Sequence, residues 1–130
     1  MKILVGYNGS SESQAALALA GDYAKQQGGH VMVVTSTEGG KGERPEDIAQ
    51  AEAHLGDVKK RLNSQGVTTE VFQTARGMSP GEDLVRLATA QAVDLIVVGV
   101  EKRSRAQKLL LGSTAQYVIL KAPCPVLSTK

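Results

Sequence analysis

Short apolar runs rich in β-branched residues alternate with helical patterns along the whole chain. Five runs predict strands and four intervening segments predict helices. The expected strands cover residues 2–7, 30–36, 67–75, 94–100 and 125–129, and the expected helices cover 12–27, 46–65, 80–92 and 113–121. Such alternation implies right-handed parallel crossovers and a sheet with helices on both faces. We therefore predict a single α/β domain over residues 1–130.

Apolar spacing and capping residues support the individual elements. Within 46–65 apolar residues recur every three or four positions, as in one face of an amphipathic helix. Ser79 and Glu82 have the spacing of a capping box at the start of the third helix. Residues 3–5 and 95–98 are continuously apolar, which is typical of strands buried on both faces. Ligands of open α/β sheets bind beyond the carboxyl ends of the strands, so the loops after strands one and four are the expected sites.

Composition excludes several classes of function. A formal net charge of +2 is too small a surplus for a general nucleic-acid binder, and 3% aromatic residues without Trp exclude stacking platforms for single strands. The single cysteine, Cys124, excludes an internal disulfide and a Cys-ligated zinc site, and we expect it to be an unreactive apolar contact. No apolar stretch approaches the ~20 residues of a membrane span, so we expect a cytoplasmic protein.

The loop after the first strand, residues 6–13, contains two glycines and three serines. Ser11 and Gln14 fit a capping box at the start of the first helix. The glycine spacing is not that of the dinucleotide fingerprint, and the G-K-[ST] of a Walker A loop is missing. By itself this loop is compatible with a plain capped turn or with a turn that faces a ligand.

The stretch after the fourth strand carries a stronger signal. Gly112, Ser113 and Thr114 stand immediately before a helix, whose free N–H groups and positive dipole end attract phosphate. Four cations precede them against one acid, Glu101: Lys102, Arg103, Arg105 and Lys108. The alternative to a phosphate site is that Ser113 and Gln116 form a capping box and that the four cations lie on a solvent-exposed surface.

Together these features resemble the universal stress protein family. Its nucleotide motif, G-x2-G-x9-G-[ST] after strand four, is matched without a gap at Gly99, Gly112 and Ser113, but Lys102 stands at the second glycine. The first loop of the family usually reads Asp-Gly-Ser, and here it begins with Asn8. A Pro-Val strand near the C-terminus is also typical. The resemblance extends over nearly the whole chain.

The resemblance implies a Rossmann-like sheet of the adenine nucleotide alpha hydrolase type, with strand order 3-2-1-4-5. It also implies an adenine nucleotide as ligand, with ATP expected. By carry-over, Asn8 lies near the ribose and phosphates, Val34 contacts the adenine and Gly99 lets the nucleotide cross the strand end. The expected phosphate contacts are Gly112, Ser113 and Thr114.

Two departures from the family pattern bear on binding. Asn8 is neutral and a poorer ligand for Mg²⁺ than the usual Asp. Lys102 replaces a glycine, and its side chain either blocks the phosphates or adds a charge that holds them. The sequence leaves both outcomes open.

The last strand resembles the edge through which the family forms homodimers, which places Val126, Leu127 and Ser128 at the interface. Symmetric dimers are the commonest oligomers. The alternative is a monomer whose edge is blunted by Pro123 and Pro125.

We therefore expect a cytoplasmic, homodimeric sensor or adaptor in a stress response that binds an adenine nucleotide. No general base is placed to activate water, so no catalytic residue is predicted and hydrolysis is at most slow. We do not expect His30 and His54 to pair with each other or with a serine nucleophile, and no metal ligands are predicted. Two alternatives stay open: a nucleotide-free dimeric interaction module, and a weak ATPase.

Overall fold

The computed structural model describes residues 1–36, 45–74, 77–100 and 112–129. The strands are β1 (Lys2–Gly6), β2 (His30–Ser36), β3 (Thr68–Thr74), β4 (Leu95–Gly99) and β5 (Val126–Thr129). The helices are α1 (Ser11–Gln27), α2 (Pro45–Ser64), α3 (Pro80–Ala90) and α4 (Ser113–Lys121). Each predicted element is present, and its ends differ from the prediction by at most two residues. Lys102 and the other cations near it lie outside the described residues.

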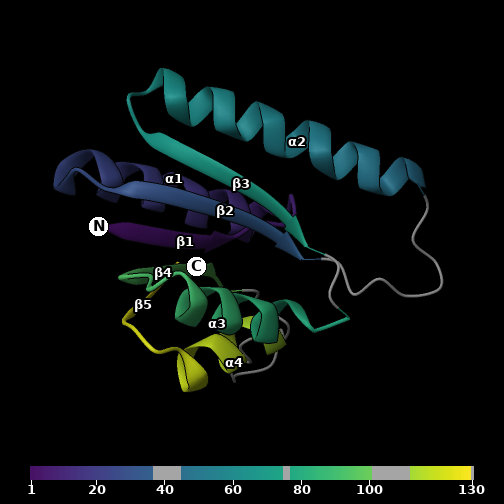
Figure 1. Ribbon diagram of the computed structural model, residues 1–130, viewed down its shortest axis with the longest axis vertical. Coiled ribbons are helices and arrows are strands. Elements are labelled where there is room, and N and C mark those ends of the chain that lie inside the picture. Colours follow the sequence, from purple (N-terminus) through teal and green to yellow (C-terminus); the bar gives the residue numbers. More distant parts are fainter. Residues whose placement is uncertain (37–44, 75–76, 101–111, 130) are drawn as a thin grey trace, which may run out of the picture.

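The five strands form one parallel sheet in the order β3-β2-β1-β4-β5, which confirms the expected topology (Figure 1). β1 is central, and its Leu4 lies opposite Met32 of β2 and Ile96 of β4. The chain first proceeds outward from β1 to β3 and then continues on the other side with β4 and β5. Strand order therefore reverses between β1 and β4, which is where open α/β sheets bind ligands.

Helices cover both faces of the sheet (Figure 1). Along β1, Ile3 and Val5 pack against α1 and α2, whereas Leu4 between them packs against α3 and α4. This alternation follows from the two-residue period of a strand. Because each face meets helices, every position of β1 from Ile3 to Val5 must be apolar, which explains the continuous runs in the sequence. None of the helices within the described ranges is long and apolar enough to cross a membrane.

The carboxyl end of β4 contacts the first turn of α1 through Gly99. A Cβ atom at this position would lie 2.2 Å from the carbonyl oxygen of Glu12 and 2.5 Å from its carbonyl carbon. No real Cβ contact is that short, and backbone atoms cannot move aside as a flexible side-chain end can. Helix–strand packing alone therefore requires glycine here, in addition to any role in ligand binding.

We expect Gly99→Ala to lower the free energy of unfolding by about 3 kcal/mol, because the added methyl group must push α1 away from β4. Gly56 of α2 is the matched control, since an added Cβ there meets nothing within 4 Å. Gly56→Ala should raise stability by roughly 0.5–1 kcal/mol, the gain of alanine over glycine inside a helix. Urea unfolding measures both changes, and a Gly99→Ala variant as stable as the parent would contradict the close approach.

Candidate functional site

A cavity of about 260 Å³ lies at the carboxyl ends of β1, β2 and β4. The first turns of α1, α3 and α4 complete its wall. Its volume is close to the lower limit of roughly 300 Å³ for small-molecule sites. The cavity therefore occupies the crevice that the reversal of strand order predicts.

Six of the seven residues predicted from the sequence line this one cavity: Asn8, Val34, Gly99, Gly112, Ser113 and Thr114. They come from β1, β2, β4 and α4 or the loops beside them, so only the folded sheet brings them together. The seventh, Lys102, is not among the described residues, and its two alternative roles stay open.

Hydrogen bonds within the loop between β1 and α1 fix its shape. The Asn8 side-chain oxygen accepts from the Ser10 backbone N–H at 3.0 Å, and the Asn8 backbone N–H donates to Ser13 Oγ at 3.3 Å. Since the side-chain oxygen is engaged, the Asn8 amide nitrogen is the group that remains available to a ligand as a donor. Asn8 is thus better suited to donate a hydrogen bond to a ligand oxygen than to coordinate a metal ion.

The helix cap of α1 differs from the prediction by one residue. Ser10, in an extended conformation, is the N-cap, and its Oγ accepts from the Ser13 backbone N–H at 3.2 Å. The expected box of Ser11 and Gln14 is wrong, because Gly9 turns the chain with φ +84° and makes Ser11 the first helical residue. The Gln14 side chain donates instead to the Gly9 carbonyl at 3.1 Å.

Glu12 places a carboxylate on the cavity wall, a feature that sequence reasoning missed. A hydrogen bond from its own backbone N–H lowers the pKa of Glu12, against a smaller desolvation effect, and the Ser10 and Ser11 side chains lower it further. Ser11 Oγ donates to Glu12 Oε2 at 3.2 Å. Together with the Ser10 cap, this carboxylate satisfies the N-terminus of α1 from within the chain.

The N-terminus of α4 is arranged differently. Its N-cap is Gly112, which has no side chain to accept from the first N–H groups of the helix. The alternative capping box of Ser113 and Gln116 does not form, since Ser113 is the first helical residue and the Gln116 backbone N–H bonds the Gly112 carbonyl at 3.0 Å. N–H groups that receive no side-chain cap from Gly112, together with the positive dipole end of α4, therefore adjoin the cavity.

The opposite end of the cavity is mostly apolar. Val34 of β2 and Pro80 and Leu84 of α3 form its walls, with Ser36 as the polar member. Val34 and Ser36 are two residues apart on a strand and so share a face. This two-residue period of the strand could have identified Ser36 as a lining residue from the sequence. The cavity thus combines a donor-rich end at α4 with a flat apolar end at α3.

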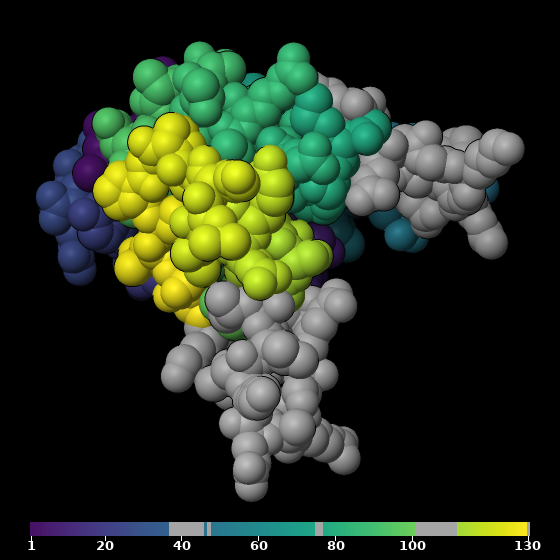
Figure 2. Space-filling view, turned by 90° about the horizontal axis from the view of Figure 1, so that it is seen from below, coloured from purple at the N-terminus to yellow at the C-terminus, as the bar shows by residue number. Residues whose placement is uncertain are grey.

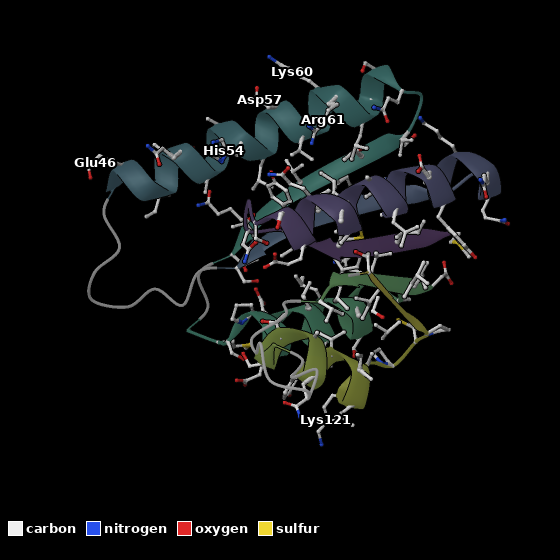
Figure 3. All side chains as sticks on the ribbon, turned by 180° about the vertical axis from the view of Figure 1, so that it is seen from behind. Glu46, His54, Asp57, Lys60, Arg61 and Lys121 are labelled. Carbon is white, nitrogen blue, oxygen red and sulfur yellow. The ribbon has the colours of Figure 1, made fainter. Side chains whose placement is uncertain are left out.

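No group of three or more His, Cys, Asp or Glu side chains in the described ranges could hold a metal ion. Neither histidine lines the cavity: His30 lies 3.5 Å from Glu70 at the other end of the sheet, and His54 is exposed on α2 (Figure 3). Cys124 is half-buried against the α3–α4 side of the core, and burial raises the pKa of its thiol, with Asp94 adding to the effect. Within the described ranges, both histidines and Cys124 therefore lie apart from the cavity.

Comparison with known proteins agrees with this geometry. The model of the universal stress protein family matches residues 1–130. A universal stress protein of Mycolicibacterium smegmatis is 32% identical over 128 residues, which cover 98% of this chain and 96% of that protein. Among solved structures, a universal stress protein from Archaeoglobus fulgidus has a TM-score of 0.86 at 34% identity, covering 100% of this chain and 93% of that chain. Another, from the same organism in complex with dAMP, has a TM-score of 0.83 at 31% identity, covering 100% and 98%.

The lowered pKa of Glu12 predicts a pH-dependent contribution to stability. A carboxylate whose pKa is lower in the folded state stabilises the fold above its unfolded pKa, and this stabilisation is lost as pH falls through the folded pKa. We expect Glu12→Gln to be less stable than the parent at pH 7, with the difference shrinking below about pH 4.5. Urea unfolding between pH 7 and pH 3 measures it.

Glu52, exposed on α2, is the control for that series. Glu52→Gln should differ little from the parent at any pH. A Glu12→Gln variant whose deficit is constant from pH 7 to pH 3 would show that the carboxylate charge is not what stabilises α1.

Proposed function

Because the chain belongs to the universal stress protein family, we propose that its cavity binds an adenine nucleotide and that the protein acts as a sensor or adaptor. The observation that carries this proposal is the N-terminus of α4, whose N-cap Gly112 has no capping side chain, beside a cavity lined by six residues of the expected site. The relative solved in complex with dAMP supports the ligand class. A role in a stress response and a cytoplasmic location are part of the proposal.

The two ends of the cavity give the nucleotide an orientation. The phosphates face Gly112, Ser113 and Thr114, where free backbone donors and two hydroxyls surround an anion. The base lies at the apolar end between Val34 and the first turn of α3. The ribose then passes Asn8, whose amide nitrogen can donate to a sugar or phosphate oxygen.

ATP is the proposed ligand, and its Mg²⁺ would be held by the phosphates rather than by the described residues. Mg²⁺ prefers carboxylate and carbonyl oxygens. On the cavity wall, the Asn8 oxygen already accepts from Ser10 and the Glu12 carboxylate from its own N–H and Ser11. Since the described residues also hold no group of three or more His, Cys, Asp or Glu side chains that could bind a metal ion, the phosphates are the better source of magnesium ligands.

A sensor is favoured over an efficient enzyme by the side chains on the cavity wall. Hydrolysis needs a general base within reach of the attacking water. Among the described wall residues the one carboxylate is Glu12, which is hydrogen-bonded within the first turn of α1, and none is a histidine. Bound nucleotide would act by shifting the balance between two states of a partner-binding surface.

Calorimetric titration with ATP and with AMP, each with and without Mg²⁺, tests the proposal on freshly purified protein. We expect binding in the micromolar range. Absence of heat at millimolar nucleotide, together with no nucleotide in a denaturing extract, would leave the nucleotide-free interaction module as the function. Turnover lost in Ser113→Ala would instead establish the weak ATPase.

The phosphate end has a matched pair of variants, because Ser113 and Ser11 are both exposed first residues of helices. Only Ser113 lines the cavity. An Asp at position 113 should stabilise α4 by about 0.3–1 kcal/mol. At position 11 the loss of the Ser11–Glu12 hydrogen bond and the repulsion from Glu12 offset this gain. Ser113→Asp should also weaken AMP binding at least about 10-fold through charge repulsion, with adenosine binding unchanged. Ser11→Asp should leave AMP binding nearly unchanged, and equal effects of the two variants would refute phosphate binding at α4.

We also propose that the protein is a homodimer through β5, the edge strand beside β4. Figure 2 shows β5 and α4 forming one continuous surface in yellow and yellow-green. The Pro125 carbonyl accepts from the Ile96 N–H of β4 at 3.1 Å, and the Thr129 carbonyl accepts from the Val100 N–H, just after β4, at 2.7 Å. Because alternate residues of a parallel strand face opposite neighbours, Val126 and Ser128 direct their backbone groups outward, away from β4. These groups would pair with a second copy, and Leu127 would pair with β4.

Ser128→Pro removes one outward N–H group, so we expect it to convert the dimer to a monomer. Edge strands tolerate proline where the N–H does not serve the sheet. Light scattering coupled to gel filtration measures the mass. Ser128→Ala keeps the N–H and should remain dimeric, and a parent protein that is monomeric throughout the micromolar range would contradict the proposal.

A further inference from the structure

Asp83 of α3 is a buried carboxylate behind the apolar end of the cavity. Its side chain is 1% exposed. The Oδ2 atom accepts from Ser36 Oγ at 2.7 Å and from Thr74 Oγ1, whereas the Oδ1 atom has no partner among the described residues. A buried carboxylate with an unpaired oxygen is costly and rare, so its presence calls for a physical reason. The positive dipole end of α3 reduces this cost but does not account for the unpaired oxygen.

The register of the sheet brings the three side chains together. Ser36 and Thr74, the last residues of β2 and β3, lie opposite one another. Asp83, in the first turn of α3, reaches both. Of the three, only Ser36 lines the cavity. The network therefore meets a ligand through one atom, the Ser36 hydroxyl oxygen.

The direction of the hydrogen bonds fixes what that oxygen can do. A carboxylate accepts and does not donate, so the single proton of Ser36 is directed to Asp83. Thr74 likewise directs its proton to Asp83, with its Oγ1 atom 3.4 Å from Ser36 Oγ. With its proton engaged, Ser36 can offer a ligand only lone pairs. It is therefore an acceptor that prefers an N–H group.

We propose that Ser36, held as an acceptor by Asp83, selects a 6-amino purine over a 6-oxo purine. This inference rests on the proposed function and on the orientation that puts the base at the apolar end. Adenine presents an amino donor at position 6, whereas hypoxanthine presents a carbonyl acceptor there. Two facing acceptors repel and leave a desolvated polar group unpaired. Ser36 is then a specificity residue, and Asp83 is a positioning residue that acts through it.

Calorimetric titration with AMP and IMP tests the inference, because these nucleotides carry the same ribose and phosphate and differ in the ring at position 6 and N1. We expect the parent to bind AMP ~10-fold more tightly than IMP, the effect of one hydrogen bond exchanged for a mismatch. Ser36→Ala should bring the ratio to within ~2-fold of unity, because AMP loses its acceptor and IMP is no longer repelled by it.

Asp83→Ala should also bring the ratio near unity, but by strengthening IMP, since a released Ser36 hydroxyl can rotate and donate to the 6-oxo group. Thr74→Val is the matched control. Valine has nearly the shape of threonine but lacks the hydroxyl, and the hydrogen bond from Ser36 to Asp83 is kept. The ratio of AMP to IMP affinity should therefore stay at the parent value. Urea unfolding establishes that each variant is folded. If Asp83→Ala does not fold, Ser36→Ala still tests the inference.

The failure of this inference differs from the failure of the proposed function. If the parent binds neither nucleotide at millimolar concentration, nucleotide binding itself is refuted. If the parent binds AMP but does not discriminate against IMP, or if Ser36→Ala keeps the full ratio, nucleotide binding stands and base selection by Ser36 is wrong. A Thr74→Val variant that loses the ratio as Ser36→Ala does would assign the network a structural role alone.

Discussion

The contact between Gly99 and the backbone of Glu12 decides where the ends of the other elements lie. It holds the first turn of α1 directly on the carboxyl end of β4. Because β4 is the neighbour of β1 at the reversal of strand order, this contact closes one side of the crevice. The N-terminus of α4, which follows β4 in the chain, then faces the same space. A single position without a side chain therefore allows two helix N-termini to adjoin one cavity.

These two helix N-termini are electrostatically unlike, although both point into the crevice. In α1 the Ser10 cap and the Glu12 carboxylate satisfy the free N–H groups, so that helix adds negative charge to the wall. In α4 the cap is Gly112, which has no side chain to accept from the first N–H groups of the helix. An anionic ligand placed beside α4 is thus attracted by one helix and repelled by the carboxylate of the other. This asymmetry directs a phosphate group toward α4.

The sequence predicted the architecture well because periodicity and alternation are local signals. Elements and most lining residues follow from apolar spacing, from the parallel crossover rule and from the resemblance of the two loops to a family. Ser79 caps α3 as predicted, but the cap of α1 was displaced by one residue because a cap depends on the turn before it, and Gly9 makes Ser10 the N-cap. The network of Ser36, Thr74 and Asp83 could not be predicted, because it depends on the register between β2 and β3.

Stability and binding are related in opposite ways at the two ends of the cavity. At the base end, the hydrogen bonds that join β2, β3 and α3 through Asp83 are the same bonds that orient Ser36 toward a ligand. Tightening that network would stabilise the fold and sharpen the proposed selection together. At the phosphate end, Glu12 stabilises α1 with a charge that a phosphate must approach. Greater stability there opposes binding, as is common where a functional site and the fold make different demands on one group. Substitutions that raise affinity without loss of stability should therefore be found at the base end rather than at Glu12.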